Sequence, residues 1–273
     1  KEATRLNPMT EPFQRRGLPV ASAPFEQVTI KPVEGAVTVL ITALPYYFAP
    51  LPGQNLARFA ALPDYHQYFG EMLEAIAAEL SARDPSHFFK PFTDNSPVDE
   101  QKAAWISGLA VKGKNNLCIT EKGSFIFLGE IITDATISLP VTPPEKRCGD
   151  CRRCIDACPN GALTEEGFDH QRCLAYLTQK KGELTEEEQA AIRKNGIAWG
   201  CDRCSEVCPH NAGLPTAPIA LPPNQLLPRL TVKDIESMTA RQFRETYSRR
   251  AFAWRGKATM LRNLHILEDT PNE

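Results

Sequence analysis

The sequence predicts an α+β fold, with an αβ domain first, a cysteine-rich domain second and a helical tail at the C-terminal end. A β-branched run at 36–44 indicates a buried strand, and apolar residues at helical spacing follow from residue 65. Eight of the nine cysteines then fall between residues 148 and 208. The predicted domains are 1–143, 144–214 and 215–273.

The composition argues against several classes of protein. The 273 residues are 42% hydrophobic and carry a formal net charge of −2, which is not the balance of a disordered chain. No apolar run is long enough to span a membrane, which needs roughly 18 residues or more. We see no signal peptide, although the chain begins at Lys1 instead of Met. The odd number of cysteines favours thiolate ligands in a reducing, cytoplasmic compartment over a disulfide scaffold.

The elements of the first domain follow from apolar periodicity and from Pro and Gly positions. Asp64 is expected to be the N-cap of the long helix, and Pro45 to end the first strand. The expected elements are an extended arm at 1–35, the strand at 36–44, a loop with a short helical piece at 50–63, a helix from Asp64 to Leu80, a strand at 88–92, a helix at 97–109, a hairpin of 117–120 with 124–133, and a linker at 140–144.

Helices dominate the rest of the predicted chain. Two helices, at about 169–180 and 185–195, are expected between the halves of the cysteine-rich domain. A proline-rich segment at 215–228 then leads to helical periods at 232–247 and 256–267.

The cysteine spacing is the most specific signal in the sequence. Two Cys-x-x steps lead from Cys148 through Cys151 to Cys154, and Cys158-Pro159 follows; Cys201, Cys204 and Cys208-Pro209 repeat the ending. This is the bacterial ferredoxin spacing, in which the cysteine before proline ligates the other cluster. The predicted ligands are Cys148, Cys151, Cys154 and Cys208 for one 4Fe–4S cluster, and Cys158, Cys173, Cys201 and Cys204 for a second.

Zinc is the alternative for these cysteines, because Cys-x-x-Cys pairs also hold tetrahedral zinc. The run of three closely spaced cysteines and both Cys-Pro endings favour iron–sulfur clusters.

Several local stretches together resemble the epoxyqueuosine reductases, the cobalamin-dependent iron–sulfur enzymes of queuosine biosynthesis. These stretches are Asp64-Tyr65-His66, Thr93-Asp94-Asn95-Ser96-Pro97, Gly113-Lys114-Asn115, Gly123-Ser124, Phe127-Leu128-Gly129-Glu130-Ile131, Cys173 to Thr178, and Arg262-Asn263. The sequence departs from the family pattern at Ser96 and Ala110, where the family has glycine, and residues 1–35 match poorly.

The resemblance implies an N-terminal domain of the cobalamin-binding type and removal of an epoxide oxygen from epoxyqueuosine in tRNA. By position, Asp94 matches the catalytic aspartate, and Asp94, Cys118, Leu128 and Ala175 match residues that contact the corrin. A carboxyl donor must hold its proton near neutral pH, which requires burial. The residues alone favour a turn or helix-cap role for Asp94 and a small buried apolar side chain for Cys118; the matching context of the family favours the catalytic role of Asp94.

RNA binding is compatible with the low net charge, because a local basic patch decides it. The resemblance places Lys180, Lys181 and Gly182 at the RNA. In the tail, Arg249, Arg250 and Arg255 lie among Phe243, Tyr247, Phe252 and Trp254, which are candidates for stacking on bases. The alternative is a helix face packed by its aromatic residues and solvated by its arginines.

Two other functions fit parts of the sequence. One is a ferredoxin-like electron carrier, although the 147 residues before the first cluster cysteine exceed what a two-cluster fold needs. The other is a cobalamin-dependent reductase of another substrate, such as an organohalide. For the enzyme we expect a tRNA anticodon stem-loop as partner, an electron donor of the flavodoxin or ferredoxin type, and no membrane.

Overall fold

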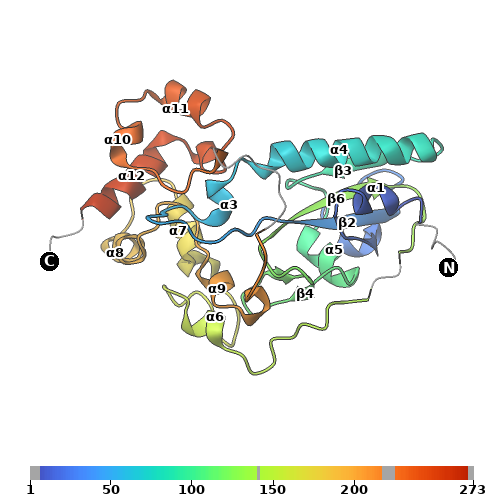
Figure 1. Cartoon of the computed structure of the whole chain (residues 1–273), viewed down its shortest axis with the longest axis horizontal. Coiled ribbons are helices and arrows are strands. Elements are labelled where there is room, and N and C mark those ends of the chain that lie inside the picture. The colour runs from blue at the N-terminus through green and yellow to red at the C-terminus, as the bar shows by residue number, and fades with distance from the viewer. Residues whose placement is uncertain (1–6, 140–141, 217–224, 270–273) are drawn as a thin grey trace. The chain divides into compact units, whose positions relative to one another are not determined.

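The computed structural model describes residues 7–139, 142–216 and 225–269, and it divides the chain into two compact units (Figure 1). Unit 1 comprises Lys1–Pro45, Tyr65–Gly113 and Leu117–Arg147, and unit 2 comprises Tyr46–Asp64, Lys114–Asn116 and Cys148–Glu273. The break at residue 147 lies close to the predicted one at 143. The segment 46–64, however, packs with the cysteine-rich part of the chain.

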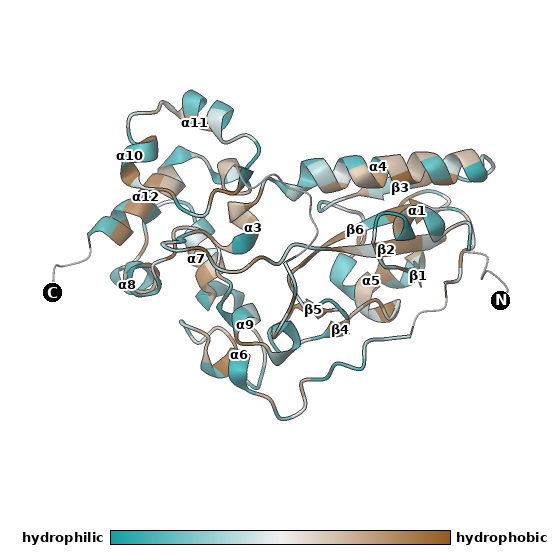
Figure 2. Ribbon diagram, viewed as in Figure 1, coloured by the Kyte–Doolittle hydropathy of each residue, from teal (hydrophilic) through white to brown (hydrophobic). Residues whose placement is uncertain are grey.

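Unit 1 is built on an antiparallel four-stranded sheet with the order β1-β2-β6-β3. Its strands are β1 (Val20–Pro24), β2 (Thr38–Pro45), β3 (Phe89–Phe92) and β6 (Ile126–Thr133). β6 pairs with β2 along its whole length and with β3 over its second half. Almost every residue of β2 and β6 is buried, so both faces of the central pair are covered. These two strands are largely brown in Figure 2.

A long helix covers one face of this sheet, and a shorter helix covers the other (Figure 1). The long helix, α4 (Tyr65–Arg83), buries Phe69, Leu73, Ile76 and Leu80, which recur at helical spacing. Gly129 of β6 lies beneath α4, where a Cβ atom would come within 2.7 Å of Leu73 and 2.8 Å of Phe69.

The helix on the opposite face is α5 (Glu100–Ile106), which packs on β1, β2 and β6. Asp99 is its N-cap and accepts a hydrogen bond from the backbone N–H of Lys102 at 2.9 Å. Ala103 and Ala104 enter the same hydrophobic core as Leu128 and Ile132 of β6. Two short helices, α1 (Glu11–Gln14) and α2 (Phe25–Val28), complete this unit.

Two predictions for unit 1 are wrong. Residues 9–32 are not an extended arm, because Val20–Pro24 forms β1 and buries Ala21 and Ala23 against the core. Residues 117–120 and 124–133 do not form a hairpin, because β2 and β3 occupy both edges of β6. Instead, β5 (Cys118–Ile119) pairs with β4 (Val111–Lys112).

Among the residues of unit 2 that the structure describes, the regular elements are short helices joined by loops, and strand pairing is limited to isolated bridges. Its elements are α3 (Arg58–Ala61), α6 (Arg153–Asp156), η1 (His170–Arg172), α7 (Leu174–Gln179), α8 (Glu186–Asn195), α9 (Arg203–Glu206), η2 (Pro209–Asn211), α10 (Val232–Ile235), α11 (Ala240–Thr246), η4 (Ala253–Arg255) and α12 (Lys257–Glu268).

The predicted helix at 185–195 is confirmed as α8, which has a capping box of Thr185 and Glu188 and ends at Gly196 with φ of 62°. The one predicted at 169–180 is divided, because Cys173 adopts an extended conformation between η1 and α7. The helical period at 232–247 is likewise divided into α10 and α11. Residues 140–141 of the linker and 217–224 of the proline-rich segment lie outside the described residues.

The tail is part of unit 2 and is held there by a buried amide. The Asn263 side chain, on α12, donates to the carbonyls of Thr178 at 2.7 Å and Ala198 at 2.8 Å. Arg262 beside it donates to the carbonyls of Lys180 and Gly182. This pair therefore fixes the end of α7 and the approach to Cys201.

The α+β fold class is thus confirmed. No helix among the described residues has both the length and the apolar character that a membrane span requires.

Candidate functional site

The two cysteine loops of unit 2 have the same local structure. After Cys148, a turn is closed by the Cys151 N–H, which donates to the Cys148 carbonyl at 2.9 Å, and α6 begins two residues later. After Cys201, α9 begins in the same way, and the residues before the two helices have nearly equal dihedral angles. The sequence repeat is therefore also a structural repeat.

The electrostatic influence of the thiols on one another divides them into two neighbourhoods. Cys148 raises the pKa of Cys154 and Cys208, and Cys151 raises that of Cys208, with burial as the larger cause. Cys158 and Cys173 likewise raise the pKa of Cys201, to about 11, and that of Cys204, to about 12, again after burial. Cys154, from the first neighbourhood, also raises the pKa of Cys204, so the two neighbourhoods adjoin at this point.

Apart from the influence of Cys154 on Cys204, these neighbourhoods agree with the two predicted ligand sets. Among the described residues, no three His, Cys, Asp or Glu side chains are gathered as tightly as the ligands of one metal ion. The chemistry of eight thiols in two neighbourhoods fits two cubanes, each of which takes four cysteine thiolates.

Backbone N–H groups approach two of these sulfur atoms. The Lys114 N–H lies 3.4 Å from Cys148 Sγ, and the Ala162 N–H lies 3.2 Å from Cys158 Sγ. Hydrogen bonds to cluster sulfurs are one of the means by which proteins set a cluster's reduction potential.

A buried arginine lies beside the second cysteine loop. Arg58 is 2% exposed, and its guanidinium contacts Asp202 at 3.1 Å and Glu206 at 3.0 Å. Its backbone N–H also donates to Asp202 at 2.7 Å. Burial alone would lower the pKa of Arg58, but the two carboxylates outweigh it and the pKa is raised. The segment 46–64 is thereby anchored to the helix that carries Cys204.

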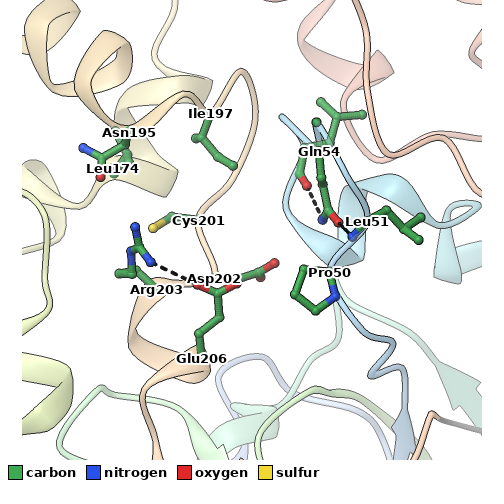
Figure 3. Close-up of a pocket in the computed structure, with 12 residues that line it drawn as sticks. Pro50, Leu51, Gln54, Leu174, Asn195, Ile197, Cys201, Asp202, Arg203 and Glu206 are labelled. Carbon is green, nitrogen blue, oxygen red and sulfur yellow. Dashed lines mark hydrogen bonds and ion pairs between the residues drawn. The ribbon is translucent and has the colours of Figure 1, made fainter.

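An open cavity of about 290 Å³ adjoins the same loop (Figure 3). Pro50, Leu51 and Gln54 line one side of it, and Cys201 and Glu206 line the other. The cavity gives solvent a path to a predicted cluster ligand.

The loop after β3 presents a carboxyl group at the surface of unit 1. Asp94 and Asn95 have φ of 58° and 48°, the left-handed conformation that these two residue types tolerate best among non-glycine residues. Asp94 Oδ2 lies 3.3 Å from His66 Nε2 at the start of α4. The Asp94 side chain is 55% exposed, so the protein alone does not supply the burial that we expected for it.

One buried and one half-buried glutamate near this loop, Glu130 and Glu100, were not predicted from the sequence. Burial raises the pKa of Glu130 to about 8, and repulsion from Glu100 and Asp94 adds to the effect. Burial also raises the pKa of Glu100 to about 7, again with a contribution from Asp94. A charged residue within the apolar run 125–132 was the signal that could have revealed Glu130.

The four residues predicted to contact cobalamin differ in their burial and in the unit to which they belong. Cys118 and Leu128 belong to the hydrophobic core of unit 1, with exposures of 5% and 8%. Burial raises the pKa of the Cys118 thiol to about 12, so it is a small apolar side chain and not a reactive one. Ala175 is half-buried on α7 in unit 2. Asp94 is thus the one of the four with substantial exposure.

Several of the basic residues predicted to bind RNA make contacts within the protein. Arg250 donates to the carbonyls of Ala61 at 3.0 Å and Gln225 at 2.6 Å, and burial lowers its pKa. Lys180 pairs with Glu188 at 2.6 Å. Lys181, Gly182 and Arg249 are exposed.

Most of the tail's aromatic residues are also internal. Phe243 and Phe252 are fully buried, and Phe252 packs against Trp199 and Tyr247. Trp254 is the exception, since it is 63% exposed and carries the Arg255 guanidinium 3.7 Å above its ring. The packing interpretation therefore holds for the helix face, and Trp254 with Arg255 forms an exposed stacking surface.

The fold and the cysteine site define an iron–sulfur protein with a separate sheet-based unit. Residues 147–211 match the family described as a 4Fe-4S double cluster binding domain, which confirms two 4Fe–4S clusters as the cofactors.

The particular relatives are epoxyqueuosine reductases. The protein of that name from Bacillus anthracis is 37% identical over 245 residues, which is 85% of this chain and 63% of the relative. A crystal structure of an epoxyqueuosine reductase superimposes with a TM-score of 0.83 at 24% identity, covering 95% of this chain and 80% of the other.

A second structure, an epoxyqueuosine reductase with an epoxyqueuosine-modified tRNA-Tyr stem loop, has a TM-score of 0.77 at 28% identity. It covers 86% of this chain and 65% of the other. The chain is therefore a relative of the epoxyqueuosine reductases over most of its length. It spans 52% to 63% of the length of the first two curated relatives it matches.

Proposed function

We propose that this chain reduces epoxyqueuosine to queuosine in tRNA, as its relatives' name indicates for them. The observation that carries the proposal is the exposed carboxyl of Asp94, held beside His66 in a chain that also contains a double 4Fe–4S domain. An electron store and a proton donor are the two components that this reduction requires.

The reaction balances with two electrons and two protons. Both C–O bonds of the epoxide break, a carbon–carbon double bond forms, and the oxygen leaves as water. Asp94 is the proposed donor of a proton to the departing oxygen, and His66 positions its carboxyl group. A general acid of this kind typically contributes about 10²–10⁴-fold to the rate.

Two clusters supply the electrons in this proposal. Cys148, Cys151, Cys154 and Cys208 would hold one, and Cys158, Cys173, Cys201 and Cys204 the other, as their mutual influence on pKa supports. An external donor of the flavodoxin or ferredoxin type would reduce them, and the cavity beside Cys201 is a path towards the second set.

Cobalamin is the third proposed cofactor, and it follows from the resemblance. When bound, it would supply the strongly reducing, nucleophilic chemistry that opening an epoxide requires. The Asp94 side chain is exposed enough to contact cobalamin, whereas Cys118 and Leu128 are almost completely buried and would contact it only through the small part that remains exposed.

The proposed substrate is a tRNA anticodon stem-loop, which also implies a cytoplasmic location. Support comes from the related enzyme that was solved with such a stem loop. In this chain, Lys181, Arg249 and Arg255 with Trp254 remain as candidate contacts. Phosphate contacts would make the affinity fall as the salt concentration rises.

A product assay tests the function. Cluster-reconstituted protein with cobalamin and a chemical reductant is incubated with an epoxyqueuosine-containing anticodon stem-loop, and the nucleosides are analysed by mass spectrometry. We expect queuosine to form only when clusters, cobalamin and reductant are all present. Intact clusters and bound cobalamin without queuosine would contradict the proposal and favour another substrate.

A further inference from the structure

A second open cavity, of about 330 Å³, lies next to the cavity beside Cys201. Both are lined by Gly53 and Gln54, so the loop that carries these two residues forms a wall of each. All the lining residues belong to unit 2. The two cavities therefore form one concave surface, which we name the Cys201 face.

Apolar side chains lie at the bottom of both cavities. Leu174 and Ile197 line the first cavity on the side of Cys201 (Figure 3), and Leu264 and Leu267 line the second. Leu174 and Leu264 are each 2% exposed, so they belong to the interior beneath the surface. Protein interfaces typically combine an apolar centre with a polar or charged rim.

Two arginines that line the second cavity have no carboxylate partner. Among the described residues, neither Arg193 nor Arg229 makes an ion pair, and the buried Nε of Arg193 has no hydrogen-bond partner. Arg229 is exposed and donates to the Gly53 carbonyl at 3.3 Å. Lys194, beside Arg193 in the last turn of α8, is also exposed. These cations are available to the carboxylates of a partner.

The acidic residues of this face are mostly bound within the protein. Asp202 and Glu206 pair with the buried Arg58 at 3.1 Å and 3.0 Å. Glu268, which lines the second cavity, accepts a hydrogen bond from the Val232 N–H at 3.3 Å. The unpaired charges beside the second cavity are therefore chiefly positive.

Helix α8 explains only part of this arrangement. Basic residues in the last turn of a helix are favoured by the helix dipole, which accounts for Arg193 and Lys194 without any partner. It does not account for Arg229, which lies before α10 and reaches the same cavity from another part of the chain.

We propose that the Cys201 face is the docking site of an acidic carrier protein that delivers one electron at a time to the cluster held by Cys201. The inference rests on the proposed function only for its electron supply, and it does not depend on the substrate. In each encounter the carrier is oxidised by one electron and the cluster is reduced by one, and no covalent bond forms or breaks. Two encounters supply the two electrons that one epoxide consumes.

The position of the cavities favours a protein electron carrier over two other partners. A pyridine nucleotide transfers a hydride, which is two electrons together, whereas an iron–sulfur cubane accepts one. RNA would also be attracted by the arginines, but Lys181, Arg249 and Trp254 line neither cavity. Electron-transfer encounters bury little surface, and complementary charge raises their association rate.

The rate of electron transfer from a flavodoxin tests the docking site. Cluster-reconstituted protein is mixed anaerobically with the hydroquinone of a bacterial flavodoxin, and formation of the flavin semiquinone is followed by stopped-flow absorbance. We expect the second-order rate constant at low salt to fall about tenfold or more when Arg193→Glu and Arg229→Glu are combined. The difference should shrink at about 1 M salt, because ions screen the charges.

A second variant tests the first cavity without a change of charge. Asn195 lines this cavity at the end of α8, so Asn195→Trp places a bulky neutral group beside the approach to Cys201. It should also slow the reaction with flavodoxin. An unchanged rate in this variant would exclude the cavity beside Cys201 as the point of electron entry.

Two controls separate docking from damage to the protein. Arg241→Glu combined with Arg244→Glu makes the same change of net charge on α11, at exposed residues that line neither cavity, and should react close to the wild-type rate. Photoreduced deazariboflavin, a small neutral reductant, should reduce the clusters of all these proteins equally fast.

The outcomes distinguish this proposal from the proposed function. An unchanged flavodoxin rate in the variant of Arg193 and Arg229 would overturn the docking site, and a weaker affinity of that variant for the stem-loop would then assign the face to RNA. A charge-dependent flavodoxin rate without queuosine formation would contradict the proposed substrate and still support the docking site.

Discussion

Asp94 and His66 meet although 28 positions separate them in the sequence. The contact depends on two consecutive left-handed residues, Asp94 and Asn95, directly after β3. Such conformations cost about 1–3 kcal/mol each in most non-glycine residues and persist where surrounding structure holds them. Ser96 and Pro97 are buried and hold the far side of the turn. The Asp94 carboxyl is therefore positioned by its backbone as well as by His66.

Replacement of this carboxyl tests its role. Asp94→Asn keeps the shape of the side chain but cannot donate an acidic proton, so we expect turnover to fall about a hundredfold or more. The clusters lie on other residues, so iron content and visible absorbance should not change. Glu71→Gln, which alters an exposed carboxylate on α4, serves as the control. Undiminished turnover would remove Asp94 from the mechanism.

Trp254 is the residue at which RNA stacking can be tested. Its ring is 63% exposed and is covered on one face by Arg255. Stacking on a base is worth about 1–3 kcal/mol, so Trp254→Ala should weaken stem-loop binding about 5- to 100-fold. Ile30→Ala, which removes another exposed apolar side chain, should leave the affinity unchanged. Equal affinities of both variants would exclude Trp254 from the interface.

At the scale of elements, the close approach of α4 to β6 requires a glycine. A Cβ atom at Gly129 would come within 3 Å of Leu73 and Phe69, in a core that has no room to give. We expect Gly129→Ala to lower the free energy of unfolding by about 1–3 kcal/mol, the usual cost of overpacking. Thermal unfolding measures this, with Gly70→Ala on α4 as a control, since its φ is not left-handed either and its Cβ would meet Thr93 at an ordinary 3.5 Å.

The Arg262-Asn263 pair joins α12 to the end of α7 and to the segment before Cys201 through hydrogen bonds. Asn263 satisfies two buried carbonyls, of Thr178 and Ala198, on either side of the segment that leads to Cys201. Asn263→Ala leaves both without a donor, at a cost of about 1–3 kcal/mol for each buried group. We expect faster loss of iron–sulfur absorbance on heating, whereas Arg244→Ala on the exposed side of α11 should match the wild type.

The sequence predicted the elements whose signals are local. The helices predicted at 185–195 and 97–109 and the strand predicted at 88–92 are found as α8, α5 and β3, because each is indicated by a short stretch of sequence. β1 was missed because its five residues include a proline and its pairing partners lie 14 or more residues away. The hairpin of 117–120 with 124–133 was predicted wrongly because the sequence around the turn at Gly123 does not show which strands pair with β6. In the folded sheet, β2 and β3 already occupy both of its edges.

The same limit applied to the candidate site. Asp94 and the cysteines lie in recognisable motifs, so they were found. Glu130 and Glu100 were not, because only the folded sheet brings them into the range of Asp94.

At the scale of the whole molecule, the buried glutamates link stability to pH. The pKa of Glu130 is about 8 when folded and 4.5 ordinarily, and that of Glu100 is about 7 when folded. Between these values, the folded chain holds protons that the unfolded chain has released. The free energy of unfolding therefore falls as the pH rises, by at most about 1.4 kcal/mol per pH unit for each group.

Glu130→Gln should remove the larger part of this pH dependence. Its amide stays neutral at every pH, so the variant should resemble the wild type at pH 4, below the window, and should unfold at a higher temperature at pH 8. Anaerobic thermal unfolding of the cluster-loaded protein, followed by circular dichroism at a series of pH values, measures the effect. Glu74→Gln should follow the wild-type curve, because its carboxyl is exposed. Parallel curves for wild type and Glu130→Gln between pH 5 and pH 8 would show that Glu130 is ionised in the folded protein, contrary to its burial without a partner.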